Sequence, residues 1–389
     1  MPRDAIVQMF DQPFQKVRAA LPRLQKMGFS HILVSPPQKS NPSRSWWGRY
    51  QPVDFRVIEG PLGNRGDLEF LCQEARRRDM FVVADAVLNH MCNDSRYMRV
   101  RGGRVVEANF PRFGVNDFYD RSRQWVGKGR GLPSLKTSSP WVRQELRDYL
   151  RMLYGIGIRG FRFDAAKHVE PEFFAHVLDG LPPMLCFGEM VYATADQFPA
   201  EALHTMKAYD FPLAHTLKEA FAPGGDLGRL VAPADFNGAL WGPHAVTFVN
   251  HHDLVKHPRD FAYFRIDDRR DRQLAYVYIL ARPDGTPYVY SGDLRSKEVK
   301  AGVEFHNWAL GQPANWLYAS RNLLVWTRGD DCLAAINKSG TPWFPGPVPC
   351  HLRPGPYRDL LGGKHWVDEH GRWATAFVAP RAAVLLVRC

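Results

Sequence analysis

The segment GFRFDAAKH at residues 160–168 joins an apolar, β-prone run to an aspartate and a histidine. Three further segments repeat this pattern: FVVADAVLNH at 81–90, FGEMV at 187–191 and FVNHHD at 248–253. A series of strands that each deliver polar groups at their C-terminal ends is how a (β/α)8 barrel builds an active site. The four segments therefore predict an α/β fold, a TIM barrel with a polar site at one end.

Strand and helix signals alternate along most of the chain, which favours a parallel sheet. The strand candidates lie at 5–10, 31–35, 81–86, 160–164, 184–189, 206–210, 245–250 and 286–291. Helical periods lie at 14–27, 67–79, 141–154, 172–178, 213–221, 269–281 and 297–308. Eight strands are the number that a closed barrel of this class needs.

Two interruptions divide the chain. A Gly- and Arg-rich stretch at 91–133 follows the third strand, and short strand-like runs separated by turns follow residue 316. We therefore expect a barrel built from 1–90 and 134–316, a short insertion at 91–133 and a small antiparallel β domain at 317–389.

The charge balance is strongly basic, with a formal net charge of +11. Basic side chains are nevertheless interspersed with acidic ones, as in 74–78 and 267–270. Such mixed runs are typical of solvated helix faces and argue against a nucleic-acid-binding protein. The short insertion and tail indicate a minimal protein that acts as a monomer.

Neither a signal peptide nor a membrane-spanning apolar run is evident in the sequence. We expect a soluble protein without a membrane partner, either intracellular or secreted with its signal removed. The six cysteines show no CxxC spacing, which disfavours a cysteine metal site. Cys332 and Cys350 lie in the tail domain and could pair, which the sequence leaves open.

The order and content of the four segments resemble the alpha-amylase family of glycoside hydrolases (family 13), most closely its animal-type members and their bacterial relatives. AIVQMF at 5–10, SPPQKS at 35–40 and WWGRYQP at 46–52 also look like that family. The resemblance covers almost the whole chain and is weakest after Tyr318. It implies that 91–133 is a short version of the family's domain B.

The resemblance implies that Asp164 is the nucleophile, Glu189 the general acid/base and Asp253 the transition-state stabiliser. Retaining cleavage needs two carboxyls about 5–5.5 Å apart, and neighbouring strands about 4.7–4.9 Å apart can supply that spacing. Arg162 lies two residues before Asp164 and so points to the same face of its strand, where it would keep that carboxylate ionised. Glu189 should have its pKa raised toward roughly 6–7 in order to donate a proton.

The resemblance also implies a set of substrate contacts around these acids. Histidines would bond the sugar in the cleavage subsite, a Lys-His pair would act on the leaving-group side, and an aromatic platform would lie on the other side. The substrate-binding residues expected on this basis are Trp46, Trp47, Tyr50, Gln51, His90, Arg162, Lys167, His168 and His252.

Members of the family hold a structural calcium ion between barrel and domain B. Asn89 matches one ligand and the backbone carbonyl of His168 another, but Ser134 stands where the family places an aspartate. Calcium prefers several oxygens, carboxylates among them, so serine is a poor replacement. Calcium binding therefore stays open, with Asp94 or Asp117 as substitutes for the missing carboxylate.

Animal-type members also bind chloride, and the resemblance predicts that this chain does not. Arg162 matches one chloride ligand, but His251 replaces an asparagine and Tyr288 replaces a distal base. His251 would either titrate near neutral pH and tune the pH profile or be a silent neighbour.

Four functions remain open. The leading one is an endo-acting alpha-amylase that hydrolyses internal α-1,4 bonds of starch, glycogen or maltooligosaccharides with retention. A maltooligosaccharide-forming hydrolase or a 4-alpha-glucan transglycosylase would use the same residues, and only its products over time would distinguish it. A catalytically dead glucan-binding protein would lack one of the three acids, all of which are present. A nucleic-acid-binding protein would show a steep salt dependence.

Overall fold

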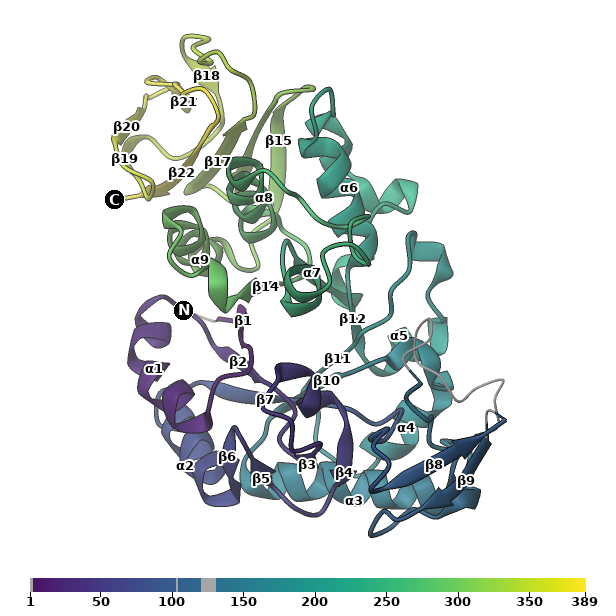
Figure 1. Cartoon of the computed structure of the whole chain (residues 1–389). Coiled ribbons are helices and arrows are strands. Elements are labelled where there is room, and N and C mark those ends of the chain that lie inside the picture. Colours follow the sequence, from purple (N-terminus) through teal and green to yellow (C-terminus); the bar gives the residue numbers. More distant parts are fainter. Residues whose placement is uncertain (1–2, 103, 120–130) are drawn as a thin grey trace.

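The computed structural model describes residues 3–102, 104–119 and 131–389, and its larger part is a closed barrel of eight parallel strands (Figure 1). Around the barrel the strands follow the order β1, β14, β13, β12, β11, β10, β7 and β2. Their bounds are β1 (Ile6–Met9), β2 (His31–Val34), β7 (Phe81–Ala86), β10 (Gly160–Phe163), β11 (Leu185–Gly188), β12 (Lys207–Tyr209), β13 (Ala245–Phe248) and β14 (Thr286–Tyr290). The predicted TIM barrel is confirmed.

Helices surround the barrel (Figure 1), and most of them bury one face, whereas the second half of α8 is buried all round. In α1 the buried side chains are Phe14, Val17, Leu21 and Leu24, which recur at the helical period. The helices are α1 (Phe14–Lys26), α2 (Arg65–Arg76), α3 (Pro140–Ile156), α4 (Pro171–Leu178), α5 (Ala200–Thr205), α6 (Phe211–Phe221), α7 (His252–Lys256), α8 (Arg269–Ala281) and α9 (Lys297–Ala309). The sequence did not predict α5 and α7, which are too short to show a period.

Short pairs of strands lie in the loops after the second and third barrel strands. The pairs are β3 (Lys39–Ser40) with β4 (Pro52–Asp54), β5 (Glu59–Gly60) with β6 (Gly63–Asn64), and β8 (Met98–Arg101) with β9 (Arg104–Ala108). The first pair flanks the 3-10 helix η1 (Trp46–Tyr50), and the last lies in the inserted segment 91–133. The insertion after the third barrel strand is therefore present and short.

The C-terminal part is an antiparallel sheet of eight strands, drawn in green to yellow in Figure 1. The strands, in spatial order, are β15 (Ala314–Ala319), β16 (Leu323–Arg328), β17 (Cys332–Asn337), β22 (Ala382–Arg388), β19 (Gly355–Asp359), β20 (Lys364–Val367), β21 (Arg372–Trp373) and β18 (Val348–Pro349). One of its faces has a hydrophobic core of its own, centred on the buried Trp373. The predicted small β domain is confirmed as a fold, with its first strand beginning at Ala314.

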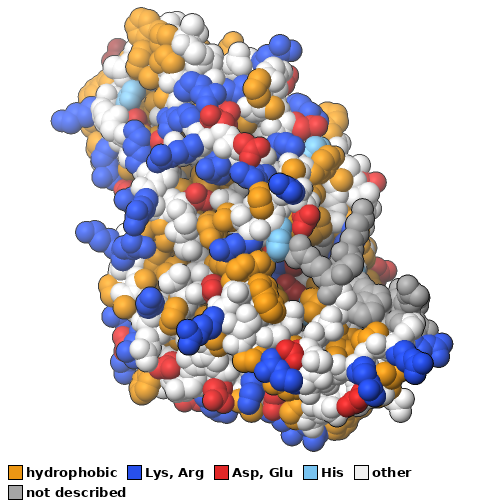
Figure 2. All heavy atoms as spheres, viewed as in Figure 1, with side chains coloured by type: hydrophobic (Ala, Val, Ile, Leu, Met, Phe, Trp, Pro, Cys, Tyr) orange, Lys and Arg blue, Asp and Glu red, His pale blue; other side chains and the backbone are white. Residues whose placement is uncertain are grey.

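Three expectations about the whole chain can be compared with the structure. The six cysteines all lie in described segments and are free, so Cys332 and Cys350, whose pairing the sequence leaves open, are not joined by a disulfide. Across the described ranges, none of the helices combines the length and apolar character needed to cross a membrane. Figure 2 shows Lys and Arg side chains spread over the visible face with Asp and Glu among them, as expected of solvated surfaces.

Candidate active site

Strands β10 and β11 place two acids side by side at the same end of the barrel. The register pairs Phe163 with Gly188, so the next residues, Asp164 and Glu189, emerge together. The backbone N–H of Glu189 donates to the carbonyl of Phe163 at 2.9 Å, which fixes this alignment. Gly160 permits the close approach of the strands, because a Cβ there would lie 2.6 Å from the carbonyl oxygen of Leu185.

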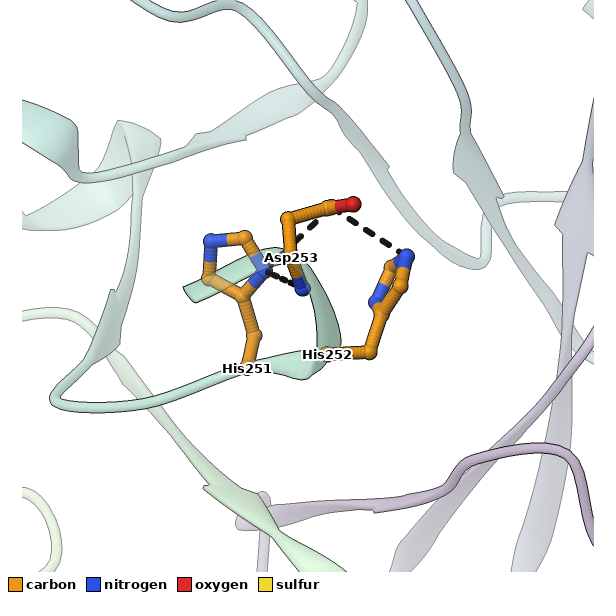
Figure 3. Close-up of side chains that lie close together, drawn as sticks. All are labelled: His251, His252 and Asp253. Carbon is orange, nitrogen blue, oxygen red and sulfur yellow. Dashed lines mark hydrogen bonds and ion pairs between the residues drawn. The ribbon is translucent and has the colours of Figure 1, made fainter. Parts of the chain in front are cut away.

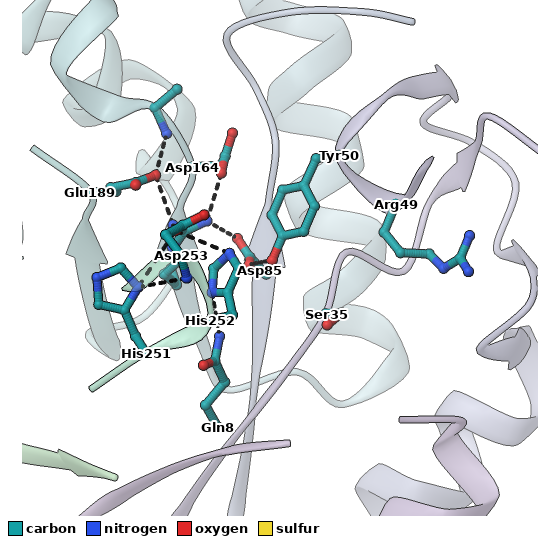
Figure 4. A network of polar contacts seen from close by, with 12 residues as sticks. Gln8, Ser35, Arg49, Tyr50, Asp85, Asp164, Glu189, His251, His252 and Asp253 are labelled. Carbon is teal, nitrogen blue, oxygen red and sulfur yellow. Dashed lines mark hydrogen bonds and ion pairs between the residues drawn. The ribbon is translucent and has the colours of Figure 1, made fainter. Parts of the chain in front are cut away.

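The guanidinium of Arg162 contacts the carboxylates of the site, and Figure 4 shows Asp85, Asp164, Glu189 and Asp253 gathered there. Its Nη1 lies 2.7 Å from Asp164 Oδ1 and 2.8 Å from Asp85 Oδ1. Its Nη2 lies 2.7 Å from Glu189 Oε2 and 4.0 Å from Asp253 Oδ2. The planar guanidinium group has N–H donors on three nitrogens and can hold more than one carboxylate in a fixed arrangement. A lysine has a single nitrogen and lacks this geometry.

The expectation that Arg162 contacts substrate is wrong. Its side chain has an exposed fraction of 0%, and it is not among the residues that line the cleft above it. Sequence alternation correctly assigned it to the same side of the strand as Asp164, but alternation carries no information on depth. The carboxylates lie between this guanidinium and any bound sugar.

Asp85 is a residue of this network that the sequence did not identify. It lies opposite Arg162 in the register of β7 and β10 and is fully buried. The hydroxyl of Tyr50 donates to its other oxygen at 2.9 Å. The signal was available, since Asp85 occurs in the apolar run of the segment at 81–90, where a buried acid requires a partner.

Burial controls the protonation of the acid at the end of β11. It raises the pKa of Glu189 to about 7, against the opposing effect of the Arg162 guanidinium. A carboxyl group with this pKa can carry a proton near neutral pH and release it. The expected raised pKa of Glu189 thus has a physical basis in the site.

His252 is fixed by contacts on both faces and at both nitrogens. Its ring stacks between Phe10, at 4.6 Å, and Tyr50, at 5.3 Å between centroids. The side-chain amide of Gln8 donates to Nδ1 at 2.8 Å, which leaves the proton on Nε2, 3.2 Å from Asp253 Oδ2. Burial lowers its pKa well below the usual value, so the ring is neutral at neutral pH.

His251 is the N-cap residue of helix α7, and its Nδ1 accepts the backbone N–H of Asp253 at a distance of 3.3 Å. Burial lowers the pKa of His251 to about 3, so this histidine does not change its charge near neutral pH. Of the two expectations for His251, this favours a residue that leaves the pH profile unaffected. Its ring stacks on Tyr209 at 5.4 Å, and Tyr209 in turn lies against Arg162.

Figure 3 shows His251, His252 and Asp253, the group of described residues close enough to share a metal ion. Hydrogen bonding already occupies this group. His251 Nδ1 accepts an N–H, His252 Nε2 carries the proton that faces Asp253, and the Arg162 guanidinium lies 4.0 Å away. A second positive charge would be repelled there, so we interpret the cluster as part of the carboxylate network.

A cleft of about 1040 Å³ opens above the carboxylates. It gathers three acids and most of the expected substrate contacts on one surface. Predicted residues that line it are Asp164, Glu189, Asp253, Trp46, Trp47, Tyr50, Gln51, His90, Lys167, His168 and His252. Residues that the sequence did not identify also line it, and they are Leu132, Ala165, Val191, His257, Asp260 and Phe261.

Two parts of the cleft lining differ in chemistry. One part is aromatic, where η1 presents Trp46 and Trp47, the latter with an exposed fraction of 42%. Another part is cationic, where Lys167 donates to the carbonyl of Val191 at 2.8 Å and lies 4.2 Å from the centre of the Tyr192 ring. An aromatic surface beside a polar, cationic one suits a ligand with apolar faces and polar edges.

The described residues around Asn89 do not fit a calcium ion. Its amide lies 3.5 Å from Ser134 Oγ, and its carbonyl accepts the N–H of Leu135, so the donors here are neutral. Asp94 is paired with Arg96 at 2.6 Å, and Asp117 accepts the backbone N–H of Gly114 at 2.8 Å. Among the described residues, neither substitute acid completes a set with several carboxylates.

Comparison with known proteins agrees with this geometry. The family model "Alpha amylase, catalytic domain" matches residues 14–129. An alpha-amylase of Aeromonas hydrophila is 31% identical, over 86% of this chain and 84% of its own length. The pancreatic alpha-amylase of Rattus norvegicus is 26% identical, over 80% of this chain and 69% of its own.

Solved structures share the fold. A mutant of alpha-amylase I from Eisenia fetida, described as a complex with maltohexaose, superposes with a TM-score of 0.85 and 19% identity. The match covers 100% of this chain and 97% of the other.

Proposed function

The chain belongs to the alpha-amylase family of glycoside hydrolases, and from that premise we propose that it is an endo-acting alpha-amylase. It hydrolyses internal α-1,4-glucosidic bonds of starch, glycogen or maltooligosaccharides, with retention, through a covalent glycosyl-enzyme on Asp164. The observation that carries this proposal is the single guanidinium of Arg162, which binds Asp164 at one nitrogen and Glu189 at the other, each at 2.7 Å.

The roles of the three acids follow from their surroundings. Asp164 attacks the anomeric carbon while Glu189, protonated through its raised pKa, donates a proton to the leaving oxygen. Glu189 then removes a proton from water, which attacks the glycosyl-enzyme and frees Asp164. Asp253 bonds sugar hydroxyls and opposes the oxocarbenium charge of both transition states.

Endo action is supported by the open cleft, whose lining extends beyond the acids to Trp46 and Trp47 of η1 and to Lys167 and His168. A glucan chain can lie across such a cleft without placing an end in it. Among the residues that the structure describes, the neutral contacts of Asn89 support stability without calcium.

The decisive experiment compares the unmodified protein with Asp164→Asn on soluble starch. We expect release of reducing ends and a rapid fall in polymer length from the unmodified protein, and neither from Asp164→Asn. Asp179→Asn, at a side chain that is 70% exposed and does not line the cleft, is the matched control and should remain active.

Proton NMR of the first products tests the stereochemistry. Retention predicts α-anomers before mutarotation. Initial β-anomers would refute the glycosyl-enzyme on Asp164, and release of a single short product from the chain end would refute endo action.

A further inference from the structure

A basic cavity of about 610 Å³ lies between the end of α1 and one face of α9, two helices that are neighbours around the barrel (Figure 1). The α9 residues in its lining are Lys300, Glu304, Asn307 and Trp308, whose spacing places them on one side of the helix. Among the described residues, this cavity and the catalytic cleft have no lining residue in common. It is therefore a separate feature of the barrel surface.

A close contact between the two helices fixes part of the cavity lining. Asn307 Nδ2 donates to the carbonyl of Gly28 at 3.0 Å, and a Cβ at Gly28 would lie 2.3 Å from that nitrogen. Gly28 has a φ of +95°, so this position suits glycine for its conformation as well as for the space. Leu294, which is 4% exposed, adds an apolar surface to the lining. The shape of the cavity thus rests on packed groups.

Four cationic side chains line the cavity against a single acid, Glu304. The cations are Arg23, Lys26, Arg295 and Lys300. Glu304 is paired with Arg358 of the C-terminal sheet at 2.7 Å. None of the four cations, in contrast, forms an ion pair or a side-chain hydrogen bond with another residue that the structure describes. Like charges around one cavity repel one another and concentrate a positive potential inside it, which attracts an anion.

The electrostatics of the two helices account for only part of this charge. Arg23 and Lys26 lie in the last turn of α1, where the helix dipole favours cations. Arg295 and Lys300 lie near the start of α9, where the same dipole disfavours positive charge. The second pair therefore opposes the helix that carries it, and an anion in the cavity would offset that cost.

We propose that this cavity binds a small metabolite in which a phosphate group is attached to a ring, such as a sugar phosphate or a nucleotide. The guanidinium groups of Arg23 and Arg295 suit bidentate contacts with phosphate oxygens, and the two lysines add positive charge. Trp308 lines the cavity with an exposed fraction of 40%, so its ring can stack on the apolar face of a sugar or a base. The volume is that of a site for one small molecule, which disfavours a nucleic acid chain.

The test measures binding to the full chain by isothermal titration calorimetry, with ADP, glucose 6-phosphate and inorganic phosphate as probes. We expect at least one of the two ring-bearing probes to bind more tightly than inorganic phosphate, and the tighter of the two identifies the source of the ligand. Arg295→Ala should weaken that binding about tenfold or more, since it removes a charge-assisted hydrogen bond.

Lys297→Ala is the matched control for the loss of charge. Lys297 is an exposed cation at the start of the same helix but does not line the cavity. Because salt screens exposed charges, its removal should change the affinity by less than about twofold. Trp308→Ala should weaken binding of the ring-bearing probe about three- to tenfold and leave that of inorganic phosphate unchanged.

Equal affinities of Arg295→Ala and Lys297→Ala would overturn the site. A parent that binds none of the three probes at millimolar concentration would also overturn it, and binding of RNA by such a parent would assign the charge to a macromolecular surface. Inorganic phosphate bound as tightly as both ring-bearing probes would overturn the contact with Trp308. None of these measurements depends on glucan hydrolysis, so the proposed function and this site can fail independently.

Discussion

Replacing Arg162 by lysine tests whether one guanidinium organises the catalytic acids. The side chain makes three contacts of 2.7–2.8 Å, to Asp85, Asp164 and Glu189. A lysine retains the charge but has a single nitrogen, which cannot bridge acids at both ends of a fork. Arg162→Lys therefore leaves at least one of these carboxylates without its anchor.

The expected loss follows from the value of one such contact. A hydrogen bond to a charged group contributes about 1.5–3 kcal/mol. Lost from the transition state, this corresponds to about a 10- to 150-fold decrease in kcat. A similar amount should disappear from the free energy of unfolding, because the acid left behind remains buried.

The assay combines kcat on maltoheptaose with thermal unfolding, and Arg328→Lys is the matched control. Arg328 is 1% exposed and donates to four backbone carbonyls between the barrel and the C-terminal sheet. Its replacement should lower stability to a similar extent and leave kcat of the folded enzyme unchanged. Folded Arg162→Lys with kcat within twofold of the parent would refute the reasoning, and so would an equal loss of kcat in both variants.

Three further outcomes follow from the site. The pKa of Glu189 near 7 predicts that kcat/KM falls as pH rises through about 7, because the proton donor is lost; a pH profile checks this, and a flat profile from pH 6 to 9 would contradict it. The neutral donors around Asn89 predict that EDTA changes neither activity nor the melting temperature by more than about 1 °C, and a loss of either would show that other residues bind a metal. Trp47→Ala should raise KM for maltoheptaose about two- to tenfold through loss of a ring surface in the cleft, whereas Trp366→Ala, 51% exposed on the C-terminal sheet, should not.

The fold could be predicted from the sequence because its elements are long and regular. Buried parallel strands are continuous apolar runs, and their covering helices carry an amphipathic period. Helices α5 and α7, with fewer than two turns each, carry no such signal. The barrel was predictable because it depends on the regular elements alone.

The site was predictable where polar groups directly follow a strand. Asp164 and Glu189 do so, and the cleft gathers them with Asp253. The sequence did not indicate how far below the cleft surface a side chain lies. For this reason Arg162 was assigned to the substrate and Asp85 was overlooked. His257, Asp260 and Phe261 come from the irregular segment around the end of α7, where the sequence has no periodic signal that indicates which side chains face the cleft.

The charges of the site explain how one arrangement serves two proposed steps. Four carboxyls surround Arg162, and the nearby histidines remain neutral because burial lowers their pKa. A single positive charge cannot balance four negative ones in a buried site, so a proton is retained. Burial raises the pKa of both Glu189 and Asp85 to about 7, and of these two acids only Glu189 lines the cleft, where its proton can reach the leaving oxygen. Once that proton is donated, the same excess negative charge stabilises a positively charged sugar. The retention of a proton by Glu189 and the stabilisation of the transition state therefore have one electrostatic origin.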